Sequence, residues 1–174
     1  MSNEMIVARK LHDSSIIIGT YIGYIEIIDK VCRTDRLRDL FDPIRLSLQT
    51  SIIIETFKIF DNNGKDTRNN NIRFLFSKLN DDISKKYKRE YSAKFDNFEK
   101  SIRDIRNKVV AHNISTDSQD ILFNSNIKIS DFYDFLKFVS TVCYTVDNDL
   151  IKACSSKNVK SFSKFMVFIS EVFA

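Results

Sequence analysis

The sequence predicts an all-α fold, a single-domain bundle of about five to six helices over residues 1–174. Glycine and proline are rare, with three and one in the whole chain, whereas β-sandwiches and barrels need both at their many turns. Hydrophobic residues make up 43% of the chain, which is enough for a core and argues against disorder. Apolar residues recur at helical spacing through long segments, so the helices can be placed in order.

The first predicted helix begins near Asp13 and runs to about Cys32. Asp13, or the serine that follows it, can accept hydrogen bonds from the first free backbone N–H groups. Residues 1–12 are expected to add at most a first turn. The isoleucine run in this segment leaves a strand open as an alternative. Gly19 and Gly23 lie four residues apart, which would let another helix approach closely.

Asp42 and Pro43 are the clearest start signal in the sequence. Asp42 fits an N-cap, and Pro43 fits the first helical turn, where its missing N–H costs nothing. The second helix is predicted to start there and to end at the polar run of residues 61–64. After a polar loop, a shorter helix is predicted over residues 72–84.

Three more segments complete the prediction. A helix is predicted over residues 91 to about 112, followed by a polar irregular segment in which residues 121–123 could be extended. Ser130 and Asp131 are predicted to cap the next helix. A final helix is predicted over about 159–173. The phenylalanines of these last two helices are expected in the core or in a dimer interface: Phe132, Phe135, Phe138, Phe162, Phe165 and Phe168.

The sequence carries no sign of a cofactor, a metal site or a membrane span. Cys32, Cys143 and Cys154 are odd in number and widely spaced, which predicts buried or incidental thiols in a reducing cytoplasm. The sequence does not open with a basic and then apolar leader. Its most apolar stretch, residues 14–25, is too short to span a bilayer. We therefore expect a cytoplasmic protein without a cofactor.

Positive charge is concentrated in one part of the chain. Residues 85–108 contain nine basic and four acidic residues, although the net charge of the whole chain is only +4. A basic segment of this kind suits a polyanion such as RNA. The alternative is a solvated, lysine-rich helix face.

Arg106, Asn107 and His112 form a group with the chemistry that RNA cleavage needs. A neutral imidazole can accept the proton of a ribose 2'-OH, because histidine titrates near neutral pH. A guanidinium can hold the phosphate and offset the charge that develops on it. The asparagine can hydrogen-bond the phosphate or orient the histidine. On an ideal helix Arg106 and His112 would lie about 9 Å apart along the axis.

The Arg-Asn-(x)4-His pattern resembles the signature motif of HEPN domains, small helical bundles that include many metal-independent RNases. Residues 51–61 resemble the abortive-infection (AbiU-like) branch of that family, and the likeness covers roughly residues 10–155. It implies a HEPN-like bundle acting as a metal-independent endoribonuclease, which leaves 2',3'-cyclic phosphate ends. It also implies phage defence or toxicity, and an antitoxin or nucleotidyltransferase partner.

The same resemblance implies a homodimer whose composite site holds two copies of Arg106, Asn107 and His112. Lys100, Arg103 and Lys108 would add affinity for RNA phosphates without sequence preference. A non-catalytic HEPN module that binds RNA, a nucleotide or a protein is the alternative. A purely structural helical adaptor is a third reading, in which the C-terminal helix is the docking surface.

Simpler structural roles remain open for several residues. Arg106 could pair with Asp104, and His112 could cap a helix C-terminus, where a cation is favoured. His12 is expected at the surface or in a helix cap. Asp61 is expected to be a turn residue at the end of the second helix and not a base.

Overall fold

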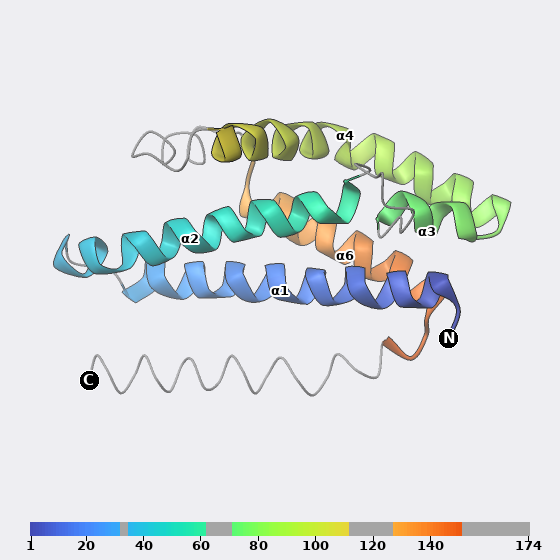
Figure 1. The fold of residues 1–174 in the computed structure, drawn as a ribbon, viewed down its shortest axis with the longest axis horizontal. Coiled ribbons are helices and arrows are strands. Elements are labelled where there is room, and N and C mark those ends of the chain that lie inside the picture. Colours follow the sequence, from blue (N-terminus) through green and yellow to red (C-terminus); the bar gives the residue numbers. More distant parts are fainter. Residues whose placement is uncertain (32–34, 62–70, 112–126, 151–174) are drawn as a thin grey trace.

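The computed structural model describes residues 1–31, 35–61, 71–111 and 127–150, and this part of the chain holds five α-helices and no strand. The all-α prediction is confirmed for these residues. Figure 1 shows the two long helices α1 and α2 side by side, with α4 on one side of the pair. The helices are α1 (Asn3–Val31), α2 (Asp35–Phe60), α3 (Ile72–Lys78), α4 (Asp81–Ala111) and α6 (Ile129–Val146).

Helix α1 begins at Asn3, much earlier than the predicted start near Asp13. The residues expected to be a leader pack into the core, where Val7, Ala8 and Leu11 are at most 3% exposed. The strand alternative for the isoleucine run is wrong, because that run lies inside α1. The close helix approach expected at Gly19 is also wrong, since a Cβ there would meet no atom within 4 Å.

Helix α2 begins at Asp35, so the predicted start at Asp42 is wrong and Pro43 lies inside the helix. Proline removes one backbone hydrogen bond and disfavours a helix interior. Helix α2 packs along α1, and tertiary packing of this kind overrides local propensity.

The predicted C-terminal end of α2 is confirmed. The backbone N–H of Asp61 donates to the carbonyl of Phe57 at 2.9 Å, so Asp61 is a turn residue as expected.

The boundary between α3 and α4 differs from the prediction, which continued the short helix to Ser84 and began the motif helix at Tyr91. Helix α3 ends at Lys78, and α4 already begins at Asp81. Asn80 caps α4, because its Oδ1 accepts from the N–H of Ile83 at 2.9 Å. The hydroxyl of Ser84 donates to the carbonyl of Phe76 at 2.6 Å, which ties the start of α4 back to α3.

Helix α6 starts at Ile129, close to the predicted cap. Asp131 acts from inside the first turn, where its carboxylate accepts from the backbone N–H of Lys128 at 2.8 Å. A group of aromatic core residues lies where α6 meets α4, and their rings pack edge to face or tilted, which is the favoured geometry for aromatic pairs. The buried rings are Tyr91, Phe95 and Phe98 of α4 and Phe132, Phe135 and Phe138 of α6.

The core placement of these three α6 phenylalanines confirms the prediction made for them. Cys143 is buried as expected, and burial raises the pKa of its thiol to about 12. Several predictions fall outside the described residues: the extended piece at 121–123, the helix over 159–173 with Phe162, Phe165 and Phe168, and the thiols of Cys32 and Cys154. Across the described ranges, no helix combines the length and the apolar character needed to cross a bilayer.

His12 is buried in α1, not placed at the surface or in a cap as the sequence suggested. It is 2% exposed, and its Nε2 lies 3.2 Å from the hydroxyl of Tyr144 in α6. Desolvation lowers the pKa of His12 from its ordinary value of 6.5, although the nearby charge of Asp13 acts in the opposite direction. The fold therefore favours the neutral imidazole at this position.

Acidification through the ordinary pKa of His12 is expected to destabilise the protein. Because folding lowers this pKa, the unfolded chain binds more protons at mildly acidic pH, and stability falls as pH drops below about 6.5. Thermal unfolding between about pH 7.5 and 5.5 tests this. The His12→Gln variant should lose most of the decrease in Tm over this range, whereas His112→Gln should keep it. The same pH dependence in wild type and His12→Gln would contradict the assignment.

Candidate functional site

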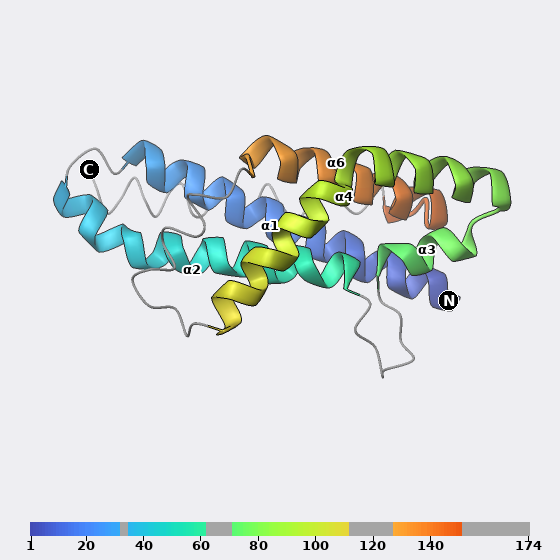
Figure 2. The same cartoon turned by 90° about the horizontal axis from the view of Figure 1, so that it is seen from above.

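The last turns of α4 carry the described part of the motif. Figure 2 shows that α4 changes direction near its middle, so that its C-terminal half crosses α2. At this crossing the guanidinium carbon of Arg106 lies 4.8 Å from the ring centroid of Phe57, a buried residue of α2. A guanidinium stacked on a ring in this way is attracted by the ring quadrupole and loses much of its rotational freedom.

Asn107 holds the other side of the Arg106 head group. Its Oδ1 accepts a hydrogen bond from Nη1 of Arg106 at 3.2 Å. Among the described residues no carboxylate lies within ion-pair distance of Arg106, so the alternative pairing with Asp104 is not formed. The ring and the amide leave most of the five guanidinium N–H donors for another acceptor. The arrangement can hold an oxyanion such as a phosphate.

Arg103, one turn before Arg106, is held by protein groups. It donates to Glu99 from Nε at 3.1 Å and from Nη2 at 2.9 Å, and also to the carbonyl of Phe60 at 3.3 Å. Its guanidinium carbon lies 5.3 Å from the ring centroids of both Phe57 and Phe60. Arg103 therefore fastens α4 to the C-terminal end of α2, and this contact limits its freedom to bind RNA.

Glu99 is the centre of this network. Its side chain is 9% exposed, and it also accepts from the hydroxyl of Tyr91 and from Nη2 of Arg73, the latter at 2.8 Å. Two guanidinium groups and one hydroxyl thus satisfy a carboxylate that burial alone would penalise. Desolvation, followed by the hydrogen bond to Glu99, raises the pKa of Tyr91 well above its ordinary value.

Glu99, Tyr91 and Arg73 were not among the residues predicted from the sequence to support the motif. The spacing of Glu99 and Arg103, four residues apart on one helix, is the usual signal for an ion pair. Glu90 and Lys94 have the same spacing and also pair, at 2.9 Å, but on the exposed side of α4. Nothing in the sequence distinguishes the buried pair from the exposed one.

Lys100 and Lys108 are both exposed on α4, before and after Arg106. Cations near the C-terminal end of a helix also interact favourably with its dipole, which is the structural alternative for Lys108. His112 follows Ala111, the last residue of α4, and lies outside the described residues. Its predicted position beside Arg106 therefore stays a prediction.

A groove of the described surface lies elsewhere, between α4 and α6. It has a volume of about 880 Å³, and its lining includes Tyr87, Phe95, Phe98 and Phe138. Arg106, Asn107 and Lys108 are not among its lining residues. Arg106 is half-buried, and Asn107 and Lys108 are exposed, so these motif residues lie at the surface outside this groove.

Comparison with known proteins supports one assignment. A protein-family model described as AbiU2, of the HEPN type, matches residues 26–156. This range contains α2, α3, α4 and α6 together with the whole Arg106–His112 motif. No curated protein and no solved structure matches the chain.

Two glutamate variants of α4 test the role of the buried network. Glu99→Gln should lower the free energy of unfolding by about 2–3 kcal/mol, because Arg73 and Arg103 both lose a charged acceptor. Glu90→Gln breaks the exposed pair with the same spacing and should cost less than about 0.5 kcal/mol. Urea unfolding of both variants measures the difference. Equal losses would show that the Glu99 network adds no more than a surface pair.

Proposed function

The chain belongs to the AbiU2 family of HEPN-type proteins, and on this basis we propose that it is a metal-independent endoribonuclease. The observation that supports the proposal is the environment of Arg106. Its guanidinium stacks on Phe57 and donates one hydrogen bond to Asn107, and its other N–H donors can bind an oxyanion. A family match of this kind points to an RNase or an abortive-infection role. Arg106 and its neighbours supply the chemical reason for preferring RNA cleavage.

The proposed reaction uses the ribose 2'-OH as the nucleophile. His112 removes the 2'-OH proton, and the 2'-oxygen forms a bond to phosphorus as the bond between phosphorus and the 5'-oxygen breaks. The 5'-oxygen leaves with a proton from a general acid, so the products are a 2',3'-cyclic phosphate and a 5'-hydroxyl. The nucleophile is part of the substrate, so the first bond-forming step needs no activated water.

Arg106 would offset the charge that builds up on the non-bridging phosphate oxygens in the transition state. Its stacking on Phe57 restricts the guanidinium before substrate binds, so the side chain loses little conformational entropy on binding. Asn107 would orient this head group and hydrogen-bond the phosphate or the histidine.

We further propose that the active form is a homodimer. The surface around Arg106 would pack against the same surface of a second copy, which is the isologous arrangement of a two-fold interface. Each copy would then contribute Arg106, Asn107 and His112 to one composite site. This arrangement would supply both a general base and a general acid, one histidine from each chain.

Lys100 and Lys108 are proposed to bind the RNA backbone on either side of the cleaved bond. Arg103 is proposed to have a mainly supporting role, because Glu99 and Phe60 already occupy its donors. In the cell, the activity would serve phage defence or act as a toxin, with an antitoxin or a nucleotidyltransferase as the partner that restrains it.

The alternative function is a HEPN module that binds RNA, a nucleotide or a protein without cleaving RNA. The C-terminal half of α4 would then use the same cations for binding alone, and His112 would have no chemical task. Cleavage requires His112 for proton transfer and binding alone does not, so substitution of His112 distinguishes the two functions.

RNA cleavage in the presence of EDTA tests the proposal. Wild type should cut labelled RNA and leave 2',3'-cyclic phosphate ends. Arg106→Ala should slow cleavage by about 10²–10³-fold through loss of transition-state stabilisation, and His112→Ala by about 10²–10⁴-fold through loss of proton transfer. End-group analysis and single-turnover rates give these values.

Arg106→Lys serves as the matched control for charge. It keeps the positive charge but not the planar donors or the stacking, so most of the loss should remain. Unchanged circular dichroism and Tm in all three variants would exclude unfolding as the cause. Cleavage at the wild-type rate by His112→Ala would overturn the enzymatic assignment and favour the binding module.

Growth of cells that express the protein gives a second test. Wild type should arrest growth, and His112→Ala should relieve the arrest at the same protein level, because toxicity would depend on chemistry at the histidine. Equal toxicity of the two proteins would favour the binding module, in which the basic residues matter and the histidine does not.

A further inference from the structure

The basic residues of α4 divide into those paired with carboxylates and those that are not. Lys94 pairs with Glu90, and Arg103 pairs with Glu99. The remaining cations of this helix have no carboxylate within ion-pair distance among the residues that the structure describes. Besides Arg106, they are exposed and lie at two places on the helix: Lys100 and Lys108 near the motif, and Lys85, Lys86, Lys88 and Arg89 near the start of α4.

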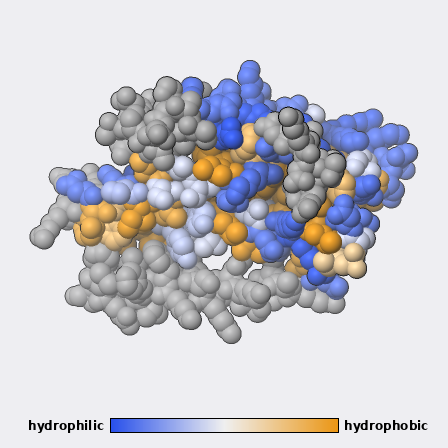
Figure 3. Space-filling model, in the orientation of Figure 1, coloured by the Kyte–Doolittle hydropathy of each residue, from blue (hydrophilic) through white to orange (hydrophobic). Residues whose placement is uncertain are grey.

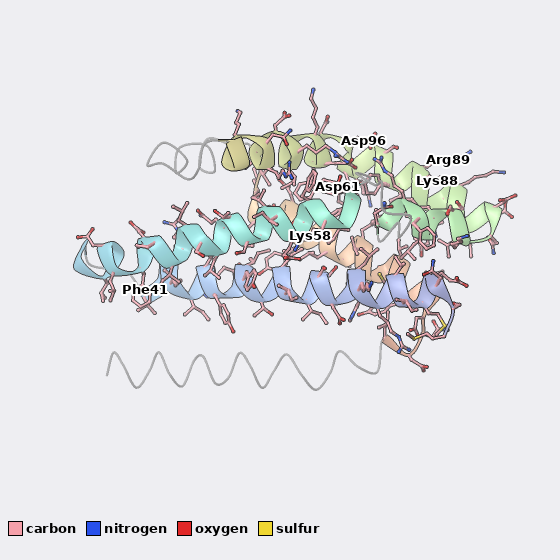
Figure 4. All side chains as sticks on the ribbon, viewed as in Figure 1. Phe41, Lys58, Asp61, Lys88, Arg89 and Asp96 are labelled. Atoms are coloured by element: carbon pink, nitrogen blue, oxygen red, sulfur yellow. The ribbon has the colours of Figure 1, made fainter. Side chains whose placement is uncertain are left out.

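The second group, residues 85–89, is here called the distal cluster, and Figure 4 labels Lys88 and Arg89 within it. Four cations within five residues repel one another, and like charges three or four positions apart destabilise a helix by about 0.2–0.5 kcal/mol per pair. Asp81 and Asp82 lie one turn away, at spacings suited to Lys85 and Lys86, yet no such pair forms in the structure. The sequence thus retains a repulsive cluster that the fold does not neutralise.

Helical register places part of the distal cluster on the same helix face as Lys100 and Asn107, whereas Arg106 lies about 100–160° farther around the helix. With 3.6 residues per turn, Lys86, Arg89 and Lys100 lie within about 60° of one another around the helix. Asn107 continues the same line toward the C-terminal end. This line, from Lys86 to Asn107, is about 30 Å long on an ideal helix, and the bend visible in Figure 2 makes the direct distance shorter.

Three residues interrupt this line, and two of them are acids. Ala93 has no polar group, and Asp96 and Asp104 are exposed acids that no cation pairs with among the described residues. Figure 4 labels Asp96. The cations therefore form two contact points and not a continuous stripe. Figure 3 shows hydrophilic residues over the N-terminal half of α4. Apart from the small Ala93, no exposed apolar side chain lies along this line, which argues against a membrane surface, because an amphipathic helix binds a membrane through its apolar face.

From this arrangement we propose that the distal cluster is a second RNA-backbone site, which holds the substrate about 30 Å or less from the motif along α4. The inference rests on the proposed function, because it takes RNA as the polyanion and Arg106 as the cleavage end. Its consequence is a preference for substrates long enough to reach both places. A short oligonucleotide would contact only one of them. The class of substrate is therefore an extended or structured RNA, not a dinucleotide.

Binding of 2'-O-methyl RNA separates this inference from catalysis, since such RNA has no free 2'-OH and cannot be cut by the proposed reaction. The variant Lys86→Gln/Arg89→Gln removes two distal cations. The control Lys10→Gln/Lys58→Gln removes two exposed cations from the α1–α2 face, where both border a shallow depression that also contains Asp13 and Glu55. The change in net charge is the same. Fluorescence anisotropy would be measured on labelled RNAs of about four and sixteen nucleotides, a common range of site sizes.

The distal variant should bind the longer RNA about tenfold more weakly than wild type, with a salt dependence of log K reduced by about 1.4 for two lost phosphate contacts. The shorter RNA should be much less affected, and the control variant should leave both affinities within about twofold. Asp96→Asn should tighten binding of the longer RNA, because it removes one of the two acids along the line. Equal effects of the distal and control variants, or no effect of either, would overturn the inference.

The inference and the proposed function can fail separately. Cleavage of ordinary RNA by wild type with no dependence of binding on the distal cluster would overturn the inference alone. Length-dependent binding that needs Lys86 and Arg89, in a protein that does not cleave, would support the inference and refute the nuclease. Binding of an acidic protein by the distal cluster, with no binding of either RNA, would overturn both.

Discussion

The burial of one carboxylate, that of Glu99, organises the region around the motif. A buried carboxylate is stable only when hydrogen-bond donors replace the water it loses, and here Tyr91, Arg73 and Arg103 supply them. These partners come from α3 and α4, and Arg103 also reaches the last carbonyl of α2. Satisfying this single group therefore fixes three helices relative to one another.

The position of Arg106 is a consequence of that constraint. Because Arg103 is pulled onto Phe57 and Phe60, the next turn of α4 also crosses over α2, and Arg106 meets the face of the Phe57 ring. The ring of Phe57 thus contacts two arginines, of which Arg103 is bound to Glu99 and Arg106 is paired with no carboxylate among the described residues. Burial and pairing, more than residue type, distinguish the supporting Arg103 from Arg106, the arginine proposed to bind phosphate.

The same distinction holds along the whole of α4. Lys94 and Arg103 belong to ion pairs of the fold, whereas the cations of residues 85–89 and those near the motif remain exposed. The net positive charge of a helix therefore indicates its capacity to bind an anion only after the cations in ion pairs are subtracted. The unpaired cations of α4 lie at two places. A polyanion that contacts both places gains electrostatic binding energy at each, without contacts to specific bases.

Much of this molecule could be predicted from its sequence. The scarcity of glycine and proline and the 3.6-residue apolar period determined an all-α fold, and local signals determined the C-terminal end of α2 and the start of α6. These features depend on residues close together along the chain, so they can be predicted from the sequence pattern alone. The Arg106–His112 spacing likewise indicated the family, which the match to AbiU2 confirms.

Only the tertiary structure decided the remaining features, because they depend on contacts between distant segments. Burial of Val7 and Leu11 extended α1 toward the N-terminus, and packing against α1 carried α2 back through Pro43, against local propensity. Tertiary contacts also decide that Glu99, and not Glu90, forms the buried ion pair of α4. Both have an arginine or lysine four residues later, and what distinguishes them is the presence of Arg73 and Phe60 beside Glu99 and its arginine.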